Sequence, residues 1–221
     1  MHTIGYRMKK ITSIVSIIGV FLFGFVADSK ETIEGLRTLG IPYSLSAEHH
    51  KSDVVIDDDK ITILANKGTD LYTNADGSSS NDTAPRVLFE PISDFSLSAK
   101  VTANFNTAYD GGALFLYADA ENWGKLLFER FKSGNNGIAS TVTRLTGDDA
   151  YHYSIENNTV YLKIERKTNT VTFLYSKDGK QWSYLRSFNL ASQTNIKVGF
   201  IAQSPLSETH EVVYSNIVFE E

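Results

Sequence analysis

The sequence predicts an all-β protein, built as a single antiparallel two-sheet sandwich over residues 43–221. Apolar and polar residues alternate with a period of two in many short segments, as in strands that bury one face and expose the other. Clusters of Gly, Asn and Asp separate these segments, and no stretch after residue 41 has the 3.6-residue period of a helix. Many short strands with regular turn signals in one domain indicate a sandwich or a barrel.

The segment at residues 95–102 shows the alternation most plainly. Phe95, Leu97, Ala99 and Val101 occupy one face, and Ser, Lys and Thr occupy the other. The remaining predicted strands are, in chain order, 60–65, 87–90, 113–118, 124–131, 138–144, 159–166, 170–175, 182–188, 196–202 and 211–219.

Three of the turns carry a prediction of their own. Asp57-Asp58-Asp59 is interpreted as a solvated hairpin turn, with a structural calcium site as the alternative. Gly111-Gly112 lacks the strand–loop–helix setting of a dinucleotide site and is interpreted as a turn. Residues 176–182 resemble an "Asp box" hairpin, in which Asp178 closes the turn and Trp182 packs beneath it.

The N-terminal residues 1–29 are predicted to form a secretory signal peptide. Arg7, Lys9 and Lys10 precede an apolar run over residues 11–27, and small residues place the expected cleavage after Ser29. An uncleaved membrane anchor and a buried core helix are the alternatives, because a run of ~17 residues is at the lower limit for crossing a bilayer. Residues 30–42 are expected to form a linker or an N-terminal strap with one short helical turn. We therefore expect a bacterial protein that is secreted or on the cell surface, and that meets the membrane only through this segment if it is uncleaved.

Composition and charge exclude several classes of function. The 26 acidic residues outnumber the 21 basic ones, for a net charge of −5, so we expect no nucleic-acid partner. The absence of cysteine excludes thiol catalysis, zinc ribbons and disulfides. There is no phosphate-cradling motif, and we expect no cofactor and no bound metal. The histidines, interpreted as exposed loop residues, are His2, His49, His50, His152 and His210.

An ordered series of segments resembles a known family. The segments are 68–72, 94–97, 109–114, 119–129, 139–144, 147–150, 162–166, 175–182 and 198–205. The series is similar to the uncharacterised family named after "regulation of enolase protein 1", and to the lectin-like C-terminal domain of bacterial β-xylosidases. The resemblance covers residues 43–220 and implies a concanavalin A-like jelly-roll sandwich whose concave face holds a sugar. The chain departs from the family pattern at residues 148–151, where members often carry a bulky aromatic residue after Thr-Arg-x-x-Asp.

The predicted strand around residues 122–130 contains the main candidate site residues. Trp123, Lys125, Leu127 and Glu129 share one of its faces. On a sheet that holds a sugar, an aromatic ring stacks on the pyranose and charged groups hydrogen-bond its hydroxyls. The candidate ligand-binding residues are Lys125, Glu129, Arg144 and Trp123, together with Tyr72, Asp148, Asp149 and Tyr151 in loops. The structural alternatives are a cross-strand charge network of Lys125 and Glu129 with Arg144, and a core or rim position for Trp123.

Together these observations predict an exported, non-catalytic carbohydrate-binding protein whose partner is a glycan. A cell-surface accessory or structural protein that binds another protein is the alternative. A glycoside hydrolase is a third hypothesis. Retaining glucanases need two carboxylates ~5–5.5 Å apart, but the Glu-x-Asp-x-x-Glu string that usually supplies them on this fold does not occur here.

Overall fold

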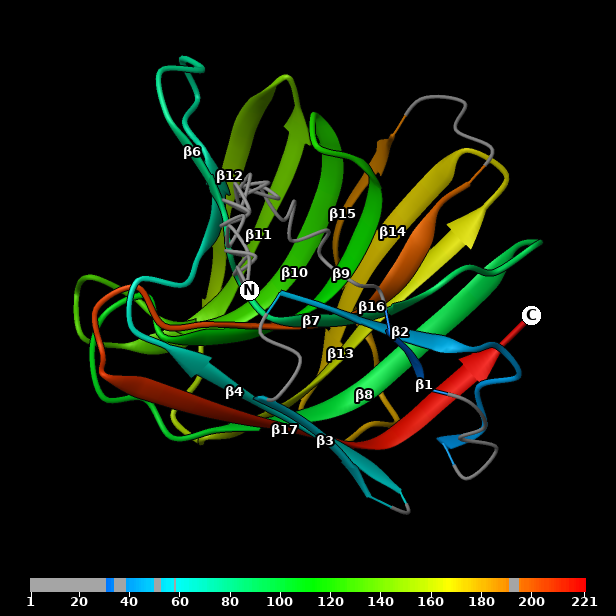
Figure 1. The fold of residues 1–221 in the computed structure, drawn as a ribbon, viewed down its shortest axis with the longest axis horizontal. Coiled ribbons are helices and arrows are strands. Elements are labelled where there is room, and N and C mark those ends of the chain that lie inside the picture. Colours follow the sequence, from blue (N-terminus) through cyan, green and yellow to red (C-terminus); the bar gives the residue numbers. More distant parts are fainter. Residues whose placement is uncertain (1–30, 34–38, 50–52, 58, 191–194) are drawn as a thin grey trace, which may run out of the picture.

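Two large antiparallel sheets pack face to face and form a sandwich (Figure 1). The structure is a computed structural model that describes residues 31–33, 39–49, 53–57, 59–190 and 195–221. No α-helix occurs within these ranges, which confirms the predicted all-β sandwich. The signal peptide expected at residues 1–29 lies outside the described residues. In the described part of the chain, no helix is long and apolar enough to cross a membrane.

Within the described ranges, the first sheet has eight strands and the second has seven. In spatial order the first contains β1 (Glu31–Ile33), β2 (Leu45–Glu48), β7 (Arg86–Phe89), β16 (Lys197–Gln203), β9 (Gly111–Asp119), β10 (Asn122–Arg130), β11 (Asn136–Arg144) and β12 (Thr146–Ser154). The second contains β15 (Ser183–Asn189), β14 (Thr170–Ser176), β13 (Thr159–Lys167), β8 (Phe95–Ala103), β17 (Thr209–Glu220), β4 (Lys60–Asn66) and β3 (Val54–Asp57). A short ribbon of β5 (Leu71–Thr73) and β6 (Ser80–Asp82) lies beside β12 (Figure 1).

Strand β10 shows how the eight-stranded sheet buries both of its faces. Leu126 and Phe128 point inward and join the main core between the two sheets. Trp123 and Leu127 point outward and join a second, smaller cluster that Leu71 of β5 covers. Because successive strand residues face opposite ways, Lys125 and Glu129 lie on this outer face too. The outer face of the eight-stranded sheet is therefore a built surface, with an apolar patch next to charged side chains.

Each strand expected from the alternation overlaps an observed strand, but six strands of the described residues were not predicted. One is β1, where a helical turn was expected. The other five are β2, β3, β5, β6 and β12. Strand β12 reads Thr-Gly-Asp-Asp-Ala-Tyr-His-Tyr-Ser and is mostly exposed, because it forms one edge of its sheet. Its sequence therefore lacks an apolar face and looks like a loop. The candidates Asp148, Asp149 and Tyr151 are consequently strand residues, and Tyr72 lies on β5, which corrects the prediction of loops.

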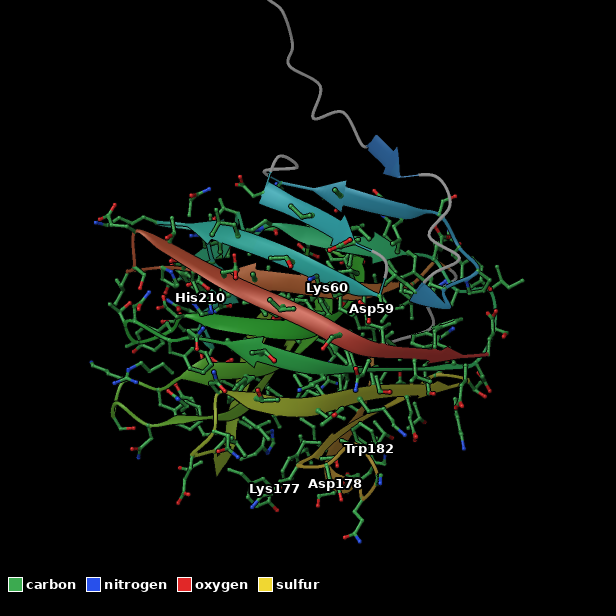
Figure 2. All side chains as sticks on the ribbon, turned by 90° about the horizontal axis from the view of Figure 1, so that it is seen from below. Asp59, Lys60, Lys177, Asp178, Trp182 and His210 are labelled. Carbon is green, nitrogen blue, oxygen red and sulfur yellow. The ribbon has the colours of Figure 1, made fainter. Side chains whose placement is uncertain are left out.

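Two turn interpretations match the structure, and one does not. Asp57 pairs with Lys60 at the end of the β3–β4 hairpin. The second turn, which contains Asp178 and Trp182, lies on a different part of the molecule from Asp59 and Lys60 (Figure 2). Asp178 accepts hydrogen bonds from the backbone N–H groups of residues 180 and 181 at 2.8 and 2.9 Å, which lower its pKa to about 2. Gly111 and Gly112 are not a turn but the first residues of β9, where a Cβ on Gly112 would lie 2.4 Å from Val212.

Two further expectations need correction. Residues 31–33 form strand β1 paired with β2, where a helical turn was expected. The packing of Trp182 beneath its turn stays a prediction; its ring lies against the Lys163 ammonium, which is 4.2 Å from the ring centroid. His210 is not an exposed loop residue. Its side chain is fully buried on β17, with Nδ1 4.0 Å from Asp110 Oδ2, so burial lowers its pKa.

Candidate functional site

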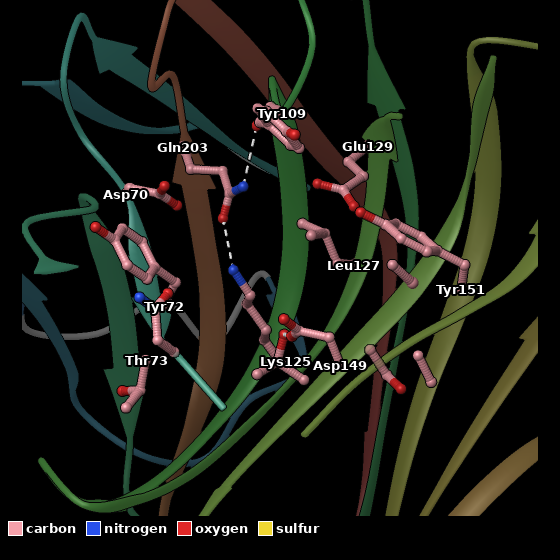
Figure 3. Close-up of a pocket in the computed structure, with 15 residues that line it drawn as sticks. Asp70, Tyr72, Thr73, Tyr109, Lys125, Leu127, Glu129, Asp149, Tyr151 and Gln203 are labelled. Carbon is pink, nitrogen blue, oxygen red and sulfur yellow. Dashed lines mark hydrogen bonds between the residues drawn. The ribbon is translucent and has the colours of Figure 1, made fainter. Parts of the chain in front are cut away.

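A cavity of about 470 Å³ opens on the outer face of the eight-stranded sheet. Strands β10, β11 and β12 supply one wall, and the β5–β6 ribbon with Gln203 of β16 supplies the other (Figure 3). Its lining residues are Asp70, Tyr72, Thr73, Asn74, Tyr109, Lys125, Leu127, Glu129, Ala139, Ser140, Thr141, Asp149, Ala150, Tyr151 and Gln203. Most of them are polar or aromatic, so the cavity offers more hydrogen-bonding groups than the mostly apolar lining of an ordinary ligand pocket.

Lys125 is buried in the cavity floor and is held in place by two acceptors. Its Nζ donates to the Leu71 carbonyl and to Gln203 Oε1, the latter at 2.9 Å. Gln203 Nε2 in turn donates to the Tyr109 carbonyl at 3.0 Å (Figure 3). The ammonium thus links β5, β10 and β16, and two of its three protons are used within the protein.

Glu129 is the buried carboxyl group of the site. Its side chain is 5% exposed, it points into the cavity (Figure 3), and no hydrogen bond to it occurs among the described residues. Burial raises its pKa to about 7, and the charges of Asp70 and Asp149 add to the rise while Lys125 opposes it. Burying an ionised carboxylate without a partner costs free energy, which favours the protonated form. With a pKa of about 7, the group is poised between its two protonation states at neutral pH.

Two more carboxyl groups flank the cavity. Asp149 accepts a hydrogen bond from the Thr141 hydroxyl at 2.5 Å. Asp70 accepts one from the Leu71 N–H at 2.8 Å, and burial raises its pKa, with Lys125 opposing the rise and Asp149 adding to it. Each carboxylate keeps acceptor capacity for a ligand.

Three tyrosines complete the cavity. Tyr72 and Tyr109 are half-buried, and Tyr151 is 64% exposed with its ring edge against Phe131. Tyr109 has a φ of +70°, a left-handed conformation that is rare for a bulky residue. Such strain clusters at functional sites, and here it places the Tyr109 carbonyl where Gln203 binds it.

The structure brings five of the predicted site residues together. Lys125, Glu129, Tyr72, Asp149 and Tyr151 all line the cavity.

The other three predicted residues lie elsewhere. Arg144 faces the seven-stranded sheet and contacts the Asn189 carbonyl at 3.4 Å, because it alternates with the outward-facing Thr143. Asp148 points the same way and pairs with Arg186 at 2.8 Å. The proposed charge network of Lys125 and Glu129 with Arg144 is therefore absent from the described residues. Trp123 is buried in the outer apolar cluster, 2% exposed, and does not line the cavity.

Of the cavity-lining residues that the sequence interpretation did not identify, four take part in the polar contacts described above. Asp70, Tyr109 and Gln203 lie within segments of the family resemblance, but nothing local connects them to Lys125. Thr141 faces outward opposite Lys125 and Asp149. The strand register would have revealed Thr141 and Asp149 as neighbours if residues 146–154 had been recognised as a strand.

The carboxyl groups of the cavity do not converge on a single point. Among the described residues, no group of three or more His, Asp or Glu side chains is placed to hold a metal ion.

Fold and site together define a β-sandwich protein with a polar pocket on the outer face of one sheet. Residues 48–221 match the family described as "Protein of unknown function (DUF1349)", and the chain belongs to this family. No curated protein matches the sequence.

Solved structures share the fold at low identity. A functionally unknown protein from Saccharomyces cerevisiae has a TM-score of 0.74 at 19% identity, over 80% of this chain and 95% of that one. The GH43 BlXynB protein from Bacillus licheniformis has a TM-score of 0.63 at 15% identity, over 80% of this chain but only 36% of its own. The alginate lyase from Klebsiella pneumoniae has a TM-score of 0.52 at 8% identity, over 79% of this chain and 86% of its own. The sandwich is thus shared with domains of carbohydrate-active enzymes.

Proposed function

We propose that this chain is a non-catalytic, lectin-like protein that holds a glycan in the cavity beside Lys125 and Glu129. The observation that carries the proposal is the cavity itself. It combines a fixed polar floor, three carboxyl groups and three tyrosine rings on one sheet face. Its volume is within the ~300–1,000 Å³ range of ligand pockets. The similarity of the fold to domains of carbohydrate-active enzymes supports a sugar as the ligand class.

The proposal includes export. The basic and then apolar pattern of residues 1–29 supports a secreted or cell-surface protein. Two resemblances stay predictions that rest on the sequence motifs given above. One is to the "regulation of enolase protein 1" family, and the other is to the lectin-like domains of β-xylosidases.

A glycan array followed by calorimetric titration of the best binder tests the proposal. We expect Tyr151→Ala to weaken binding about twofold to tenfold, since an aromatic stacking contact contributes about 0.5–1.5 kcal/mol. We expect Asp149→Ala to weaken it at least as much. Both side chains are exposed at the cavity mouth, so neither change should unfold the protein.

Two matched controls complete the experiment. Tyr153→Ala removes the same type of side chain from the same strand outside the cavity, and Arg144→Ala removes the predicted residue that faces the other sheet. Both should bind like the wild type. Equal weakening in all four variants would refute this site. No binding to any glycan, with copurification of a specific protein, would favour the accessory-protein alternative.

One observation favours a second candidate function, a glycan-cleaving enzyme. Glu129 has a pKa of about 7, which suits a general acid or base at neutral pH. Incubation with a panel of polysaccharides, followed by chromatography of the products, separates the two functions. Product release by the wild type that is lost in Glu129→Gln would establish catalysis.

A further inference from the structure

We propose that the ligand is an amino sugar with a free, positively charged amino group, and that Glu129 binds this group. This inference rests on the proposed glycan site. The site is thus selective within carbohydrates. It favours cationic glycans over neutral ones and rejects sugars that carry a carboxylate.

The charge balance of the cavity is the first argument. Among the described residues that line it, three carboxyl groups, from Asp70, Glu129 and Asp149, face one lysine. The ammonium of Lys125 donates to the Leu71 carbonyl and to Gln203. Two of its three N–H donors are thus bound within the protein, and one is left for a ligand. The cavity therefore offers mainly acceptors and negative charge, and a uronate would be repelled.

The missing partner of Glu129 is the second argument. Its carboxyl group is 5% exposed, reaches into the cavity and receives no hydrogen bond from the described residues. Buried polar groups normally have a partner, so a ligand donor fits this position. An ammonium supplies both the hydrogen bond and the opposite charge, whereas a hydroxyl supplies only the first.

A neighbouring charged cluster shows the contrast. On the same sheet, Arg86 donates to Glu48 at 3.0 Å and to Asp82 at 2.7 Å, and Lys197 donates to Glu48 at 3.0 Å. There each carboxylate has a basic partner within the protein. Among the residues that the structure describes, the carboxyl group of Glu129 has no such partner at hydrogen-bond distance.

The spread of the acceptors is the third argument. Because the described carboxyl groups do not gather around one point, they suit an extended organic cation better than a single metal ion. The tyrosines that line the same cavity add ring faces, which attract cations. A sugar ring with an ammonium and several hydroxyls matches this combination.

The test compares three sugars that differ only at C2. Trimers of β-1,4-linked glucosamine, N-acetylglucosamine and glucose carry an ammonium, an acetamide and a hydroxyl there. A second set, with galactosamine, N-acetylgalactosamine and galactose, repeats the comparison for the other common hexosamine. We expect calorimetry at low salt to show one of the free-amine trimers binding at least about tenfold more tightly than its neutral counterparts, because charge-assisted hydrogen bonds are roughly twice as strong as neutral ones. Glu129→Gln should abolish this preference, so that the free-amine and neutral trimers bind the variant with similar affinity.

Each outcome decides the question. Equal binding of free-amine and neutral trimers, or tighter binding of a galacturonate trimer, would overturn the inference and leave the glycan site standing. If no sugar on the array bound to the protein, both the amino-sugar inference and the proposed glycan site would be overturned. Trilysine tests whether charge alone is recognised, and binding as tight as that of the amino sugar would refute a sugar ligand. If Glu129→Gln does not fold, Asp149→Asn should reduce the same preference, since its amide oxygen can still accept from Thr141.

Discussion

At the scale of single residues, Glu129 costs the folded protein free energy that a ligand could restore. Its pKa rises from 4.5 to about 7 on folding, chiefly through burial. The folded state therefore holds this proton more tightly than the unfolded state. The contribution of Glu129 to the free energy of unfolding thus falls as pH rises from 4.5 to about 7, and it is constant above that range. At about 1.36 kcal/mol per pH unit, the penalty above pH 7 is roughly 3 kcal/mol.

We predict that Glu129→Gln flattens this part of the stability curve. The difference in the free energy of unfolding between variant and wild type should move in favour of the variant between pH 4.5 and 7, by on the order of 2–3 kcal/mol. Urea unfolding followed by fluorescence at four or five pH values measures it. A difference that stays the same at all pH values would show that Glu129 is ionised at ordinary cost in the folded protein.

At the scale of elements, the contact between β12 and the β5–β6 ribbon closes the cavity. Gly147 on β12 allows this contact, because a Cβ there would lie 1.9 Å from the Thr73 carbonyl oxygen. The Gly147 N–H also donates to the Asn74 carbonyl at 3.3 Å. The ribbon carries Tyr72 and follows Asp70, so its position sets the distance between the two walls.

We predict that Gly147→Ala displaces the ribbon and weakens glycan binding. Overpacking at a close contact costs about 1–3 kcal/mol, and here the backbone of residue 73 must move to relieve it. Thermal unfolding and calorimetric titration should both show the loss. Ser154→Ala, at the exposed end of the same strand, is the control, and equal behaviour of the two variants would contradict the role of Gly147.

The same elements explain how far the sequence predicts the structure. Strands with one buried face, such as 95–102, are evident from alternation alone. Strand β12 is not, since an edge strand with polar residues on both faces resembles a turn-rich loop. Lys125 and Glu129 were recognised together because they share a strand face. Leu71 and Gln203, which hold Lys125, are 54 and 78 residues away along the chain, and only the sheet order brings them to it.

At the scale of the whole molecule, the two chain ends described by the structure both pack on the sandwich. Leu39 and Ile41 precede the predicted domain start at residue 43, yet each is 3% exposed and belongs to the main core. At the other end, the Glu221 carboxylate accepts hydrogen bonds from the Tyr43 hydroxyl and from the N–H groups of Ile92 and Ser93, the last two at 3.0 and 2.9 Å. The segment before Tyr43 thus contributes to the same core as β17.

We predict that a protein truncated to begin at Tyr43 is markedly less stable than one that begins at Lys30. Burial of an aliphatic side chain contributes about 1.5–3 kcal/mol, and compact unfolded chains reduce that figure, so loss of Leu39 and Ile41 should cost on the order of 3 kcal/mol. Urea unfolding of the two proteins measures the difference, and the double variant Leu39→Ala/Ile41→Ala in the longer protein should reproduce most of it. Equal midpoints for the two lengths would mean that these side chains add nothing to the core, and that the sandwich is complete from Tyr43 onward.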